Sequence, residues 1–197
     1  LKIYNGVLTA AEIRMDYNAG QAIQLGSTGT DVSGNPSNSA DRAYCPPGDT
    51  TANCGPISEW KLDELQGSTA KDTSGNGNDG TIIIGGNGSQ TTVDQAWLEG
   101  AVGKVGGSLN FDGTDDHIST SQTSNPTDFT ASMWIYPTSW THQSHTALLT
   151  KRNAPGHGLM FFIYNQGNLN YDWGDGSSNH RWNTGYQPPL NTWTHLT

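Results

Sequence analysis

Short stretches in which hydrophobic and polar residues alternate follow one another from Ile57 onward, separated by turns rich in Gly, Asn and Asp. The clearest is residues 129–136, where Phe129, Met133 and Ile135 are expected on one face and more polar residues on the other. A period of two indicates β-strands. Further strands are expected at residues 2–4, 59–63, 81–84, 108–111, 117–120, 147–150, 159–164, 168–173 and 192–196. The chain is therefore predicted to be all-β, an antiparallel sandwich or barrel.

A helical pattern follows the first expected strand. Thr9 and Glu12 have the spacing of a capping box, in which each side chain accepts a hydrogen bond from the other residue's backbone amide. Ile13 and Tyr17 give the next turns an apolar side, and Gly20 is placed to end the helix. Residues 1–20 are therefore expected to form a strand and one short helix, a unit that closes a domain.

Residues 21–56 are rich in Gly, Ser, Thr, Asn and Pro and have few large apolar side chains, which is typical of a linker. They contain both cysteines, Cys45 and Cys54, separated by a stretch with several turn-forming residues. A disulfide that closes this loop is predicted, and it implies an oxidising compartment. A reduced pair or half of a metal site is the alternative, although no third cysteine exists to complete a thiolate site.

Composition narrows the class of protein. Charged residues make up 14% of the 197 residues, 25 residues are Gly and the formal net charge is −9. This profile is typical of a loop-rich extracellular β-protein. A negative chain without a Lys/Arg cluster argues against nucleic acid or an anionic membrane as the main partner. No apolar run approaches the roughly 20 residues of a membrane-spanning helix, so membrane insertion is not expected.

Five segments carry a resemblance to a known family. They are residues 60–64 (WKLDE), 72–81 (DTSGNGNDGT), 107–116 (GSLNFDGTDD), 129–138 (FTASMWIYPT) and 193–196 (WTHL). In this order they resemble the LamG-like (concanavalin A-like lectin/glucanase) domains of bacterial secreted or surface proteins. The resemblance implies a jelly-roll sandwich of two antiparallel sheets. It also implies a module of a large secreted protein that binds glycans or proteins, often with calcium.

The order of the segments predicts an unusual domain organisation. Residues 1–20 resemble the family's closing strand and helix, 21–56 form the linker, and 57–197 resemble a jelly roll that lacks its later strands. Three interpretations stay open: a truncated or metagenomic fragment, one segment of a tandem repeat, or an N-terminal strand that completes a sheet in this chain or in a neighbour. Unpaired sheet edges would favour self-association by strand complementation.

Two acidic turns are candidate calcium sites, because this cation prefers oxygen ligands. The candidate ligands are Asp72, Asn76 and Asp79 in the first turn and Asp112, Asp115 and Asp116 in the second. Asp72 is the strongest of these. The alternative is that these residues form the turns themselves, through bonds from side chain to backbone.

Exposed aromatic rings beside amides and carboxylates are the usual surface for sugars. One such cluster, in sequence expected to form loops, consists of Trp173, Asp175, His180, Trp182 and Tyr186, and a second consists of Trp140, His142 and His145. The alternative is that these rings pack in the protein. Other aromatic residues are assigned to the core, namely Trp60, Phe111, Phe129 and Phe161.

Signals for a transition metal or for catalysis are weak. His142 and His145 have the spacing of metal ligands but lie in a polar loop without a third partner nearby. The strand motif Glu-x-Asp-x-x-Glu of related glucanases is missing. Glu59 with Asp63 and Asp172 with Asp175 are the nearest carboxylate pairs. The first pair supplies weak catalytic candidates.

Together these patterns predict a carbohydrate-binding, lectin-like module of an extracellular or cell-surface multidomain protein, with calcium as a candidate cofactor. A structural or adhesin repeat that contacts neighbouring copies is the main alternative. A glycan-cleaving hydrolase is a weaker one.

Overall fold

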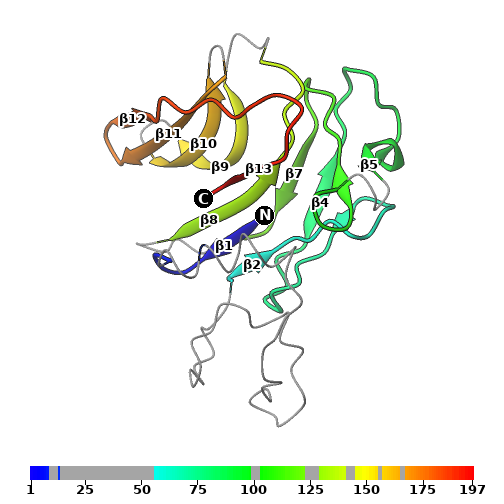
Figure 1. Cartoon of the computed structure of the whole chain (residues 1–197). Helices are drawn as coiled ribbons and strands as arrows, with labels where there is room; N and C mark the ends of the chain where they lie inside the picture. Colours follow the sequence, from blue (N-terminus) through cyan, green and yellow to red (C-terminus); the bar gives the residue numbers. More distant parts are fainter. Residues whose placement is uncertain are drawn as a thin grey trace. The chain divides into compact units, whose positions relative to one another are not determined.

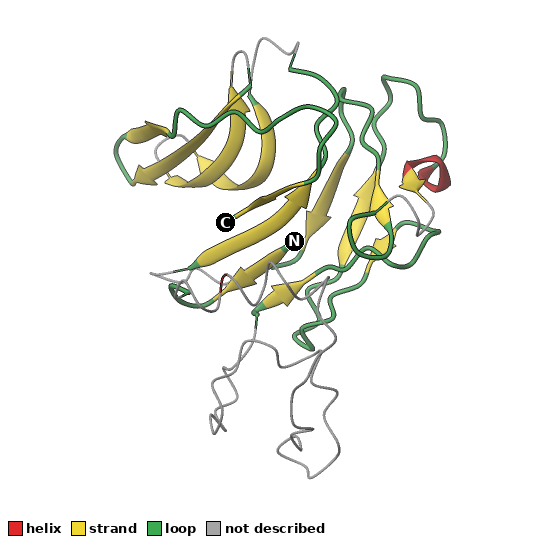
Figure 2. Cartoon of the chain, viewed as in Figure 1, coloured by secondary structure: helices red, strands yellow, loops and turns green. Residues whose placement is uncertain are grey.

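The computed structural model describes residues 1–8, 13, 56–98, 103–122, 129–140, 145–154, 157–164 and 167–197. These residues form antiparallel β-sheets with almost no helix, as predicted (Figure 1, Figure 2). The chain divides into two compact units, one made of Leu1–Trp134 with His195–Thr197 and the other of Ile135–Thr194. The predicted helix, apart from Ile13, and the two cysteines lie outside the described residues.

A four-stranded sheet in the order β13-β8-β1-β2 brings together distant parts of the chain. Its strands are β1 (Lys2–Tyr4), β2 (Ser58–Glu59), β8 (Thr130–Ile135) and β13 (Thr194–Leu196). The short β1 lies between β2 and β8 and is antiparallel to both (Figure 1). This pairing matches the interpretation in which the N-terminal strand completes a sheet of the same chain. The proposed domain boundaries stay predictions.

The rest of the first unit consists of short strands around a small core. A three-stranded sheet has the order β3-β4-β7, and β5 pairs with β6. Their bounds are β3 Thr69–Ala70, β4 Gly80–Ile83, β5 Trp97–Leu98, β6 Ser108–Leu109 and β7 His117–Thr120, with a 3-10 turn at Val93–Ala96. Trp60, Ala70, Ile82 and Trp97 form the buried cluster. The prediction that Trp60 is a core residue is confirmed.

Two sequence predictions for the first unit are wrong. The strand expected at 59–63 ends early, because Leu62 has a left-handed backbone (φ 61°) that breaks the extended conformation. Phe111, assigned to the core, is 44% exposed. It follows β6, whose two residues end the extended stretch before the alternation reaches position 111. Phe129, in turn, is only half-buried.

The second unit is built on a four-stranded sheet in the order β12-β11-β10-β9. Its strands are β9 (Thr146–Ala154), β10 (His157–Tyr164), β11 (Asn168–Asp175) and β12 (Asn179–Asn183). Each strand pairs with the next one along the chain, as in a meander. Three of these strands were predicted and are longer than expected. The fourth, β12, was wrongly expected to be a loop, since its polar composition hides its extended backbone.

Candidate functional site

One face of the sheet β12-β11-β10-β9 carries a row of rings. Because paired residues in neighbouring strands share a face, the register fixes which side chains meet. Phe161 pairs with Tyr171, Tyr171 with Trp182, and Trp173 with His180. These five residues, Phe161, Tyr171, Trp173, His180 and Trp182, are called the aromatic face below.

The rings of the aromatic face contact one another across three strands. The ring centroids of Phe161 and Tyr171 are 4.8 Å apart, those of Tyr171 and Trp173 5.3 Å, and those of Trp173 and His180 5.4 Å. The last two pairs are stacked, with interplanar angles of 21° and 26°. Exposure increases toward the edge strand, from half-buried Phe161 to Trp173 (39%) and Trp182 (61%). The row therefore offers a solvent-facing apolar surface at β11 and β12.

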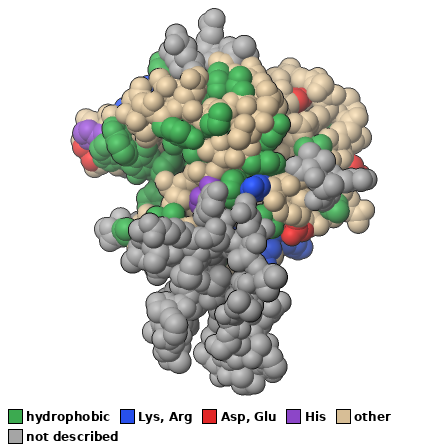
Figure 3. Space-filling model, viewed as in Figure 1, with side chains coloured by type: hydrophobic (Ala, Val, Ile, Leu, Met, Phe, Trp, Pro, Cys, Tyr) green, Lys and Arg blue, Asp and Glu red, His purple; other side chains and the backbone are tan. Residues whose placement is uncertain are grey.

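A carboxylate borders the exposed end of the row. Asp175 Oδ2 lies 2.8 Å from His180 Nε2, and Asp175 Oδ1 accepts hydrogen bonds from the backbone amides of Ser177 and Ser178. The hydrogen bond with His180, followed by those amides, holds the pKa of Asp175 well below its usual value. In Figure 3, hydrophobic, His and acidic atoms lie side by side at the left edge of the molecule. The rings are thus flanked by a fixed acceptor.

The opposite face of the same sheet anchors β12. Arg181 donates hydrogen bonds to both carboxylate oxygens of Asp172, at 2.8 and 2.9 Å, and Asp172 is only 4% exposed. The hydrogen bond that Arg181 donates to Asp172 is the main reason why the pKa of Arg181 is raised. The guanidinium also lies over the rings of Phe162 and Tyr164, at 5.0 and 4.8 Å. Since successive strand residues alternate, this anchoring directs His180 and Trp182 to the aromatic face.

The structure brings together four of the five residues of the first predicted cluster. Trp173, Asp175 and Trp182 lie at one end of the sheet, with His180 between them, whereas Tyr186 lies beyond β12, where its carbonyl accepts the amide of Leu169. The sequence did not single out Tyr171. The alternation within residues 168–173 is the signal that could have found it, because it places Tyr171 on the face of Trp173. Phe161, assigned to the core, belongs to this row instead.

Of the second predicted cluster, the structure describes Trp140 and His145. Trp140 is half-buried and packs closely against Gly167, whose left-handed backbone (φ 96°) leaves no room for a side chain there. His142 lies outside the described residues. His145 contacts the rings of Phe162 and Tyr164 and accepts a hydrogen bond from Arg181 at its Nε2 atom. Because arginine has no acceptor, this nitrogen must carry its lone pair.

The first acidic turn is organised by backbone amides. Asp72 accepts hydrogen bonds from the amides of Glu59, Ser74 and Asn78, at 2.8–3.0 Å. Burial of Asp72 acts to raise its pKa, but these hydrogen bonds prevail and lower it. Asp79 accepts hydrogen bonds from Lys71 Nζ at 2.6 Å and from the backbone amide of Asp72 at 2.9 Å. Asn76, the third predicted ligand, is exposed and donates to the carbonyl of Ile57.

The second acidic turn packs against the loop that follows β4. Asp112 accepts the amide of Ser89 at 2.7 Å, Asp115 accepts the amide of Asn87 at 3.2 Å, and Asp116 accepts the amide of Asp112 at 2.8 Å. Within the described ranges, no group of three or more His, Cys, Asp or Glu residues is arranged to hold a metal ion. In both turns the carboxylates accept backbone amides, as the alternative role in turn formation requires, and calcium binding at these turns stays a prediction.

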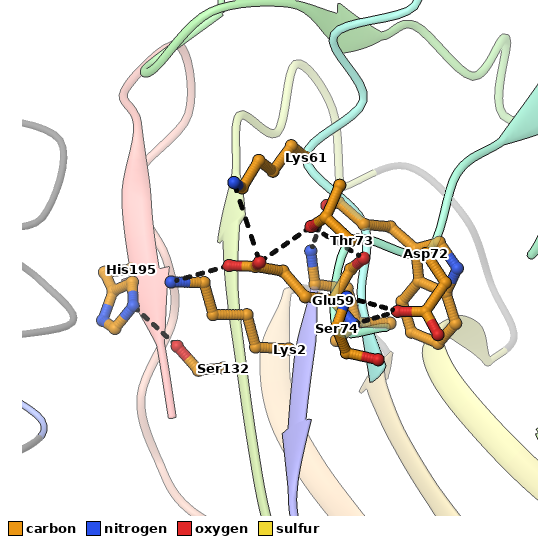
Figure 4. A network of polar contacts seen from close by, with 10 residues as sticks. Lys2, Glu59, Lys61, Asp72, Thr73, Ser74, Ser132 and His195 are labelled. Atoms are coloured by element: carbon orange, nitrogen blue, oxygen red, sulfur yellow. Dashed lines mark hydrogen bonds and ion pairs between the residues drawn. The ribbon is translucent and has the colours of Figure 1, made fainter. Parts of the chain in front are cut away.

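The two weak catalytic candidates hold structural contacts, and those of Glu59 are shown in Figure 4. Glu59, 7% exposed, lies 3.3 Å from Lys2 Nζ and accepts a hydrogen bond from Thr73 Oγ1 at 2.7 Å. Asp63 accepts the backbone amide of Gly107 at 2.7 Å instead. The other carboxylate pair is also separated, because Asp172 and Asp175 lie three residues apart in β11 and so point to opposite faces.

The same view shows a polar row that the sequence did not reveal (Figure 4). Ser132 Oγ lies 2.9 Å from His195 Nε2, and Lys2 is the strand partner of both Ser132 and Glu59. Ser132 is only 3% exposed, so its hydroxyl is closed to a substrate. The row therefore ties β13, β8, β1 and β2 together. Only the strand pairing, which is not local in sequence, brings these residues into one line.

The described residues thus form an all-β fold of antiparallel sheets, one of which carries an exposed aromatic face. Residues 112–197, which contain β7 to β13, match the family model of the concanavalin A-like lectin/glucanases superfamily. This match to the C-terminal part of the chain confirms the resemblance seen in the sequence. No curated protein and no solved structure matches the chain significantly. None of the helical segments in the described ranges has the length and apolar character needed to cross a membrane.

Proposed function

We propose that this chain is a carbohydrate-binding, lectin-like module of a secreted or cell-surface bacterial protein, and that its aromatic face is the glycan surface. The observation that carries the proposal is the exposed pair Trp173 and Trp182 beside Asp175 and His180. The match to a superfamily of lectins and glucanases supports it.

The chemistry of the aromatic face suits a sugar. The C–H face of a pyranose packs on an indole ring, and Trp182 has the larger exposed surface for that contact. Asp175, at the exposed end of the row, is an acceptor for sugar hydroxyls. Because the rings are already stacked and His180 is held by Asp175, little side-chain order has to be gained on binding.

A glycan array probed with the full chain, followed by calorimetry on a bound glycan, tests the proposal. Trp182→Ala and Trp173→Ala are each expected to weaken binding about tenfold or more, because each removes one of the two exposed rings on which a sugar would pack, and a ring contact of this kind contributes about 1 kcal/mol or more. Phe111→Ala is the matched control, since Phe111 is an aromatic residue of similar exposure (44%) in the other compact unit.

Two results would contradict the proposal. One is a folded chain that binds no glycan with or without added calcium. The other is a bound glycan whose affinity is unchanged in both tryptophan variants, which would place its site elsewhere.

We also propose that calcium binds at the acidic turns. The available oxygen ligands are Asp72, Asn76, Asp79, Asp112, Asp115 and Asp116. Binding there has to compete with the backbone amides that these carboxylates accept. Calorimetric titration with calcium, in the wild-type chain and in Asp115→Asn, tests it. A heat of binding that is seen in the wild type and lost in the variant supports calcium binding at the second turn. If the wild type gives no heat of binding, the calcium proposal is wrong.

A further inference from the structure

The strand β1 is joined to its neighbour by a connection much longer than the pairing requires. β1 and β2 are adjacent and antiparallel, with Lys2 opposite Glu59 and Ile3 opposite Ser58. Adjacent antiparallel strands need a loop of only about two to five residues. Here residues 5–57 separate them. Pairing of β1 with β2 in the same chain therefore does not require a connection of this length.

Backbone contacts hold β1 on both sides. Toward β2, the amides of Ile57 and Trp60 donate to the carbonyls of Ile3 and Leu1, at 2.8 and 3.0 Å. Toward β8, residues 2–4 pair with residues 130–132, and Thr130 Oγ1 donates to the carbonyl of Gly6 at 2.9 Å. Together β2 and β8 form a slot that receives one extended segment.

Side chains give this slot a preferred sequence and register. Leu1 and Ile3 pack against the buried cluster of the first unit. Lys2 lies on the other face of β1, together with buried Tyr4, and pairs with Glu59, whose side chain is 9% exposed. A shift by one residue would put the lysine against the core and the isoleucine against a carboxylate, so only one register satisfies both faces.

We propose that β1 also enters the slot between β2 and β8 of a second copy of this chain, so that two copies exchange their N-terminal strands. β1 makes the same contacts in the slot of its own chain and in the slot of a second copy. The monomer and the strand-exchanged dimer therefore differ mainly in the entropy of the connection between β1 and β2. Tethering within one chain gives its own strand an effective concentration on the order of millimolar. Exchange therefore becomes populated where copies are concentrated, as on a surface or in an array.

A charge-swap experiment on the full chain tests this exchange. Lys2→Glu places two carboxylates against each other within one chain, and Glu59→Lys places two amines against each other. In a mixture, reciprocal exchange restores an opposite-charge pair in both slots. We expect a one-to-one heterodimer by native mass spectrometry, at about tenfold or more the dimer level of either variant alone, which corresponds to a difference of about 1.4 kcal/mol. The chain carrying both K2E and E59K restores the pair internally and is the control, expected to be monomeric.

A second measurement uses the unaltered sequence. Chains labelled with ¹⁴N and ¹⁵N are held together at about 1 mM, near the effective concentration of the strand, and then diluted for native mass spectrometry. Dimers of mixed mass that are lost in Ile3→Asp support exchange, because this variant places a charge against the core. Absence of heterodimer in the charge-swap mixture, together with absence of mixed-mass dimers, overturns the proposal. Neither readout involves glycan, so the result is independent of the proposed lectin function.

Discussion

In the sheet β12-β11-β10-β9, every strand pairs with the strand next to it in the sequence, over strands of five to nine residues. In the sheet β13-β8-β1-β2, strands of two to six residues come from positions as distant as Tyr4 and Thr130, which are strand partners. Strands of a local meander pair after short loops close, which costs little conformational entropy. Strands that are distant in the sequence must first be brought together, which costs more entropy before any contact is gained.

The two sheets accordingly differ in the interactions that stabilise them. The local sheet buries Phe162 completely and stacks rings on its other face. The distant sheet uses a polar row in which Glu59, Lys2, Ser132 and His195 join its four strands. The comparison indicates that packing stabilises the local sheet, and that specific polar contacts select the partners in the distant one.

The largest expected effect concerns packing in the local sheet. Phe162→Ala removes a fully buried ring and is expected to lower the free energy of unfolding by about 3–5 kcal/mol. Phe161→Ala, one residue away on the half-exposed aromatic face, is the matched control and should cost clearly less. Urea unfolding followed by tryptophan fluorescence measures both. Equal losses would mean that the two faces of this sheet do not differ in packing.

The next effect concerns a polar contact at the edge of the distant sheet. Asp72→Ala leaves the amides of Glu59, Ser74 and Asn78 without their acceptor, and one unsatisfied buried amide costs about 1–3 kcal/mol. Because folding lowers the pKa of Asp72, its contribution is present above the ordinary pKa of aspartate and is lost as the pH falls through the folded value.

Unfolding of the wild type and of Asp72→Ala between pH 7 and pH 3 checks this. The difference between them should shrink on acidification. Asp79→Ala, which removes an exposed partner of Lys71, is the control and should have a smaller effect. A constant difference across this pH range would mean that Asp72 does not act through its charge.

The sequence predicted the local sheet better than the distant one, and the reason is physical. Residues 159–164 and 168–173 alternate clearly, because one face of these strands is buried, and both strands are found. The strand β12 was missed because all five of its residues are exposed, so burial imposes no alternation on it. Strand pairing between Lys2, Glu59 and Ser132 leaves no local signal in any of the three segments.

Candidate sites follow the same rule. Trp173, Asp175 and Trp182 could be predicted together because one turn brings β11 and β12 side by side. The role of Arg181 could not be predicted, since its partners Phe162 and His145 lie on other strands or loops. For the acidic turns the sequence left two roles open. The geometry shows the carboxylates accepting backbone amides, which the residue types alone do not distinguish from metal binding.

A third, smaller effect tests how β12 is anchored. Arg181→Lys keeps the charge but loses the planar, two-pronged contact with Asp172 and the hydrogen bond to His145, for a loss of about 1 kcal/mol. Glycan affinity should fall as well, because His180 and Trp182 flank Arg181 in the strand. Arg152→Lys is the control, since Arg152 makes one exposed hydrogen bond to Asn179 that a lysine can replace. Equal behaviour of the two variants in unfolding and binding would argue against an anchoring role.

The smallest effect is at the exposed end of the aromatic face. Asp175→Asn removes the carboxylate that holds His180, and because this pair is exposed its contribution to stability is small and weakened by salt. Folding lowers the pKa of Asp175, mainly through His180, so its stabilising contribution is present above the ordinary pKa of aspartate and is lost as the pH falls below it. The melting temperature of the wild type should therefore exceed that of the variant at pH 6 and approach it near pH 2. His180→Ala should reduce this pH-dependent difference, because it removes the largest cause of the lowered pKa. If the difference is the same with His180 present or replaced, the amides of Ser177 and Ser178 alone hold the carboxylate, and the polar border of the aromatic face does not depend on the stacked histidine.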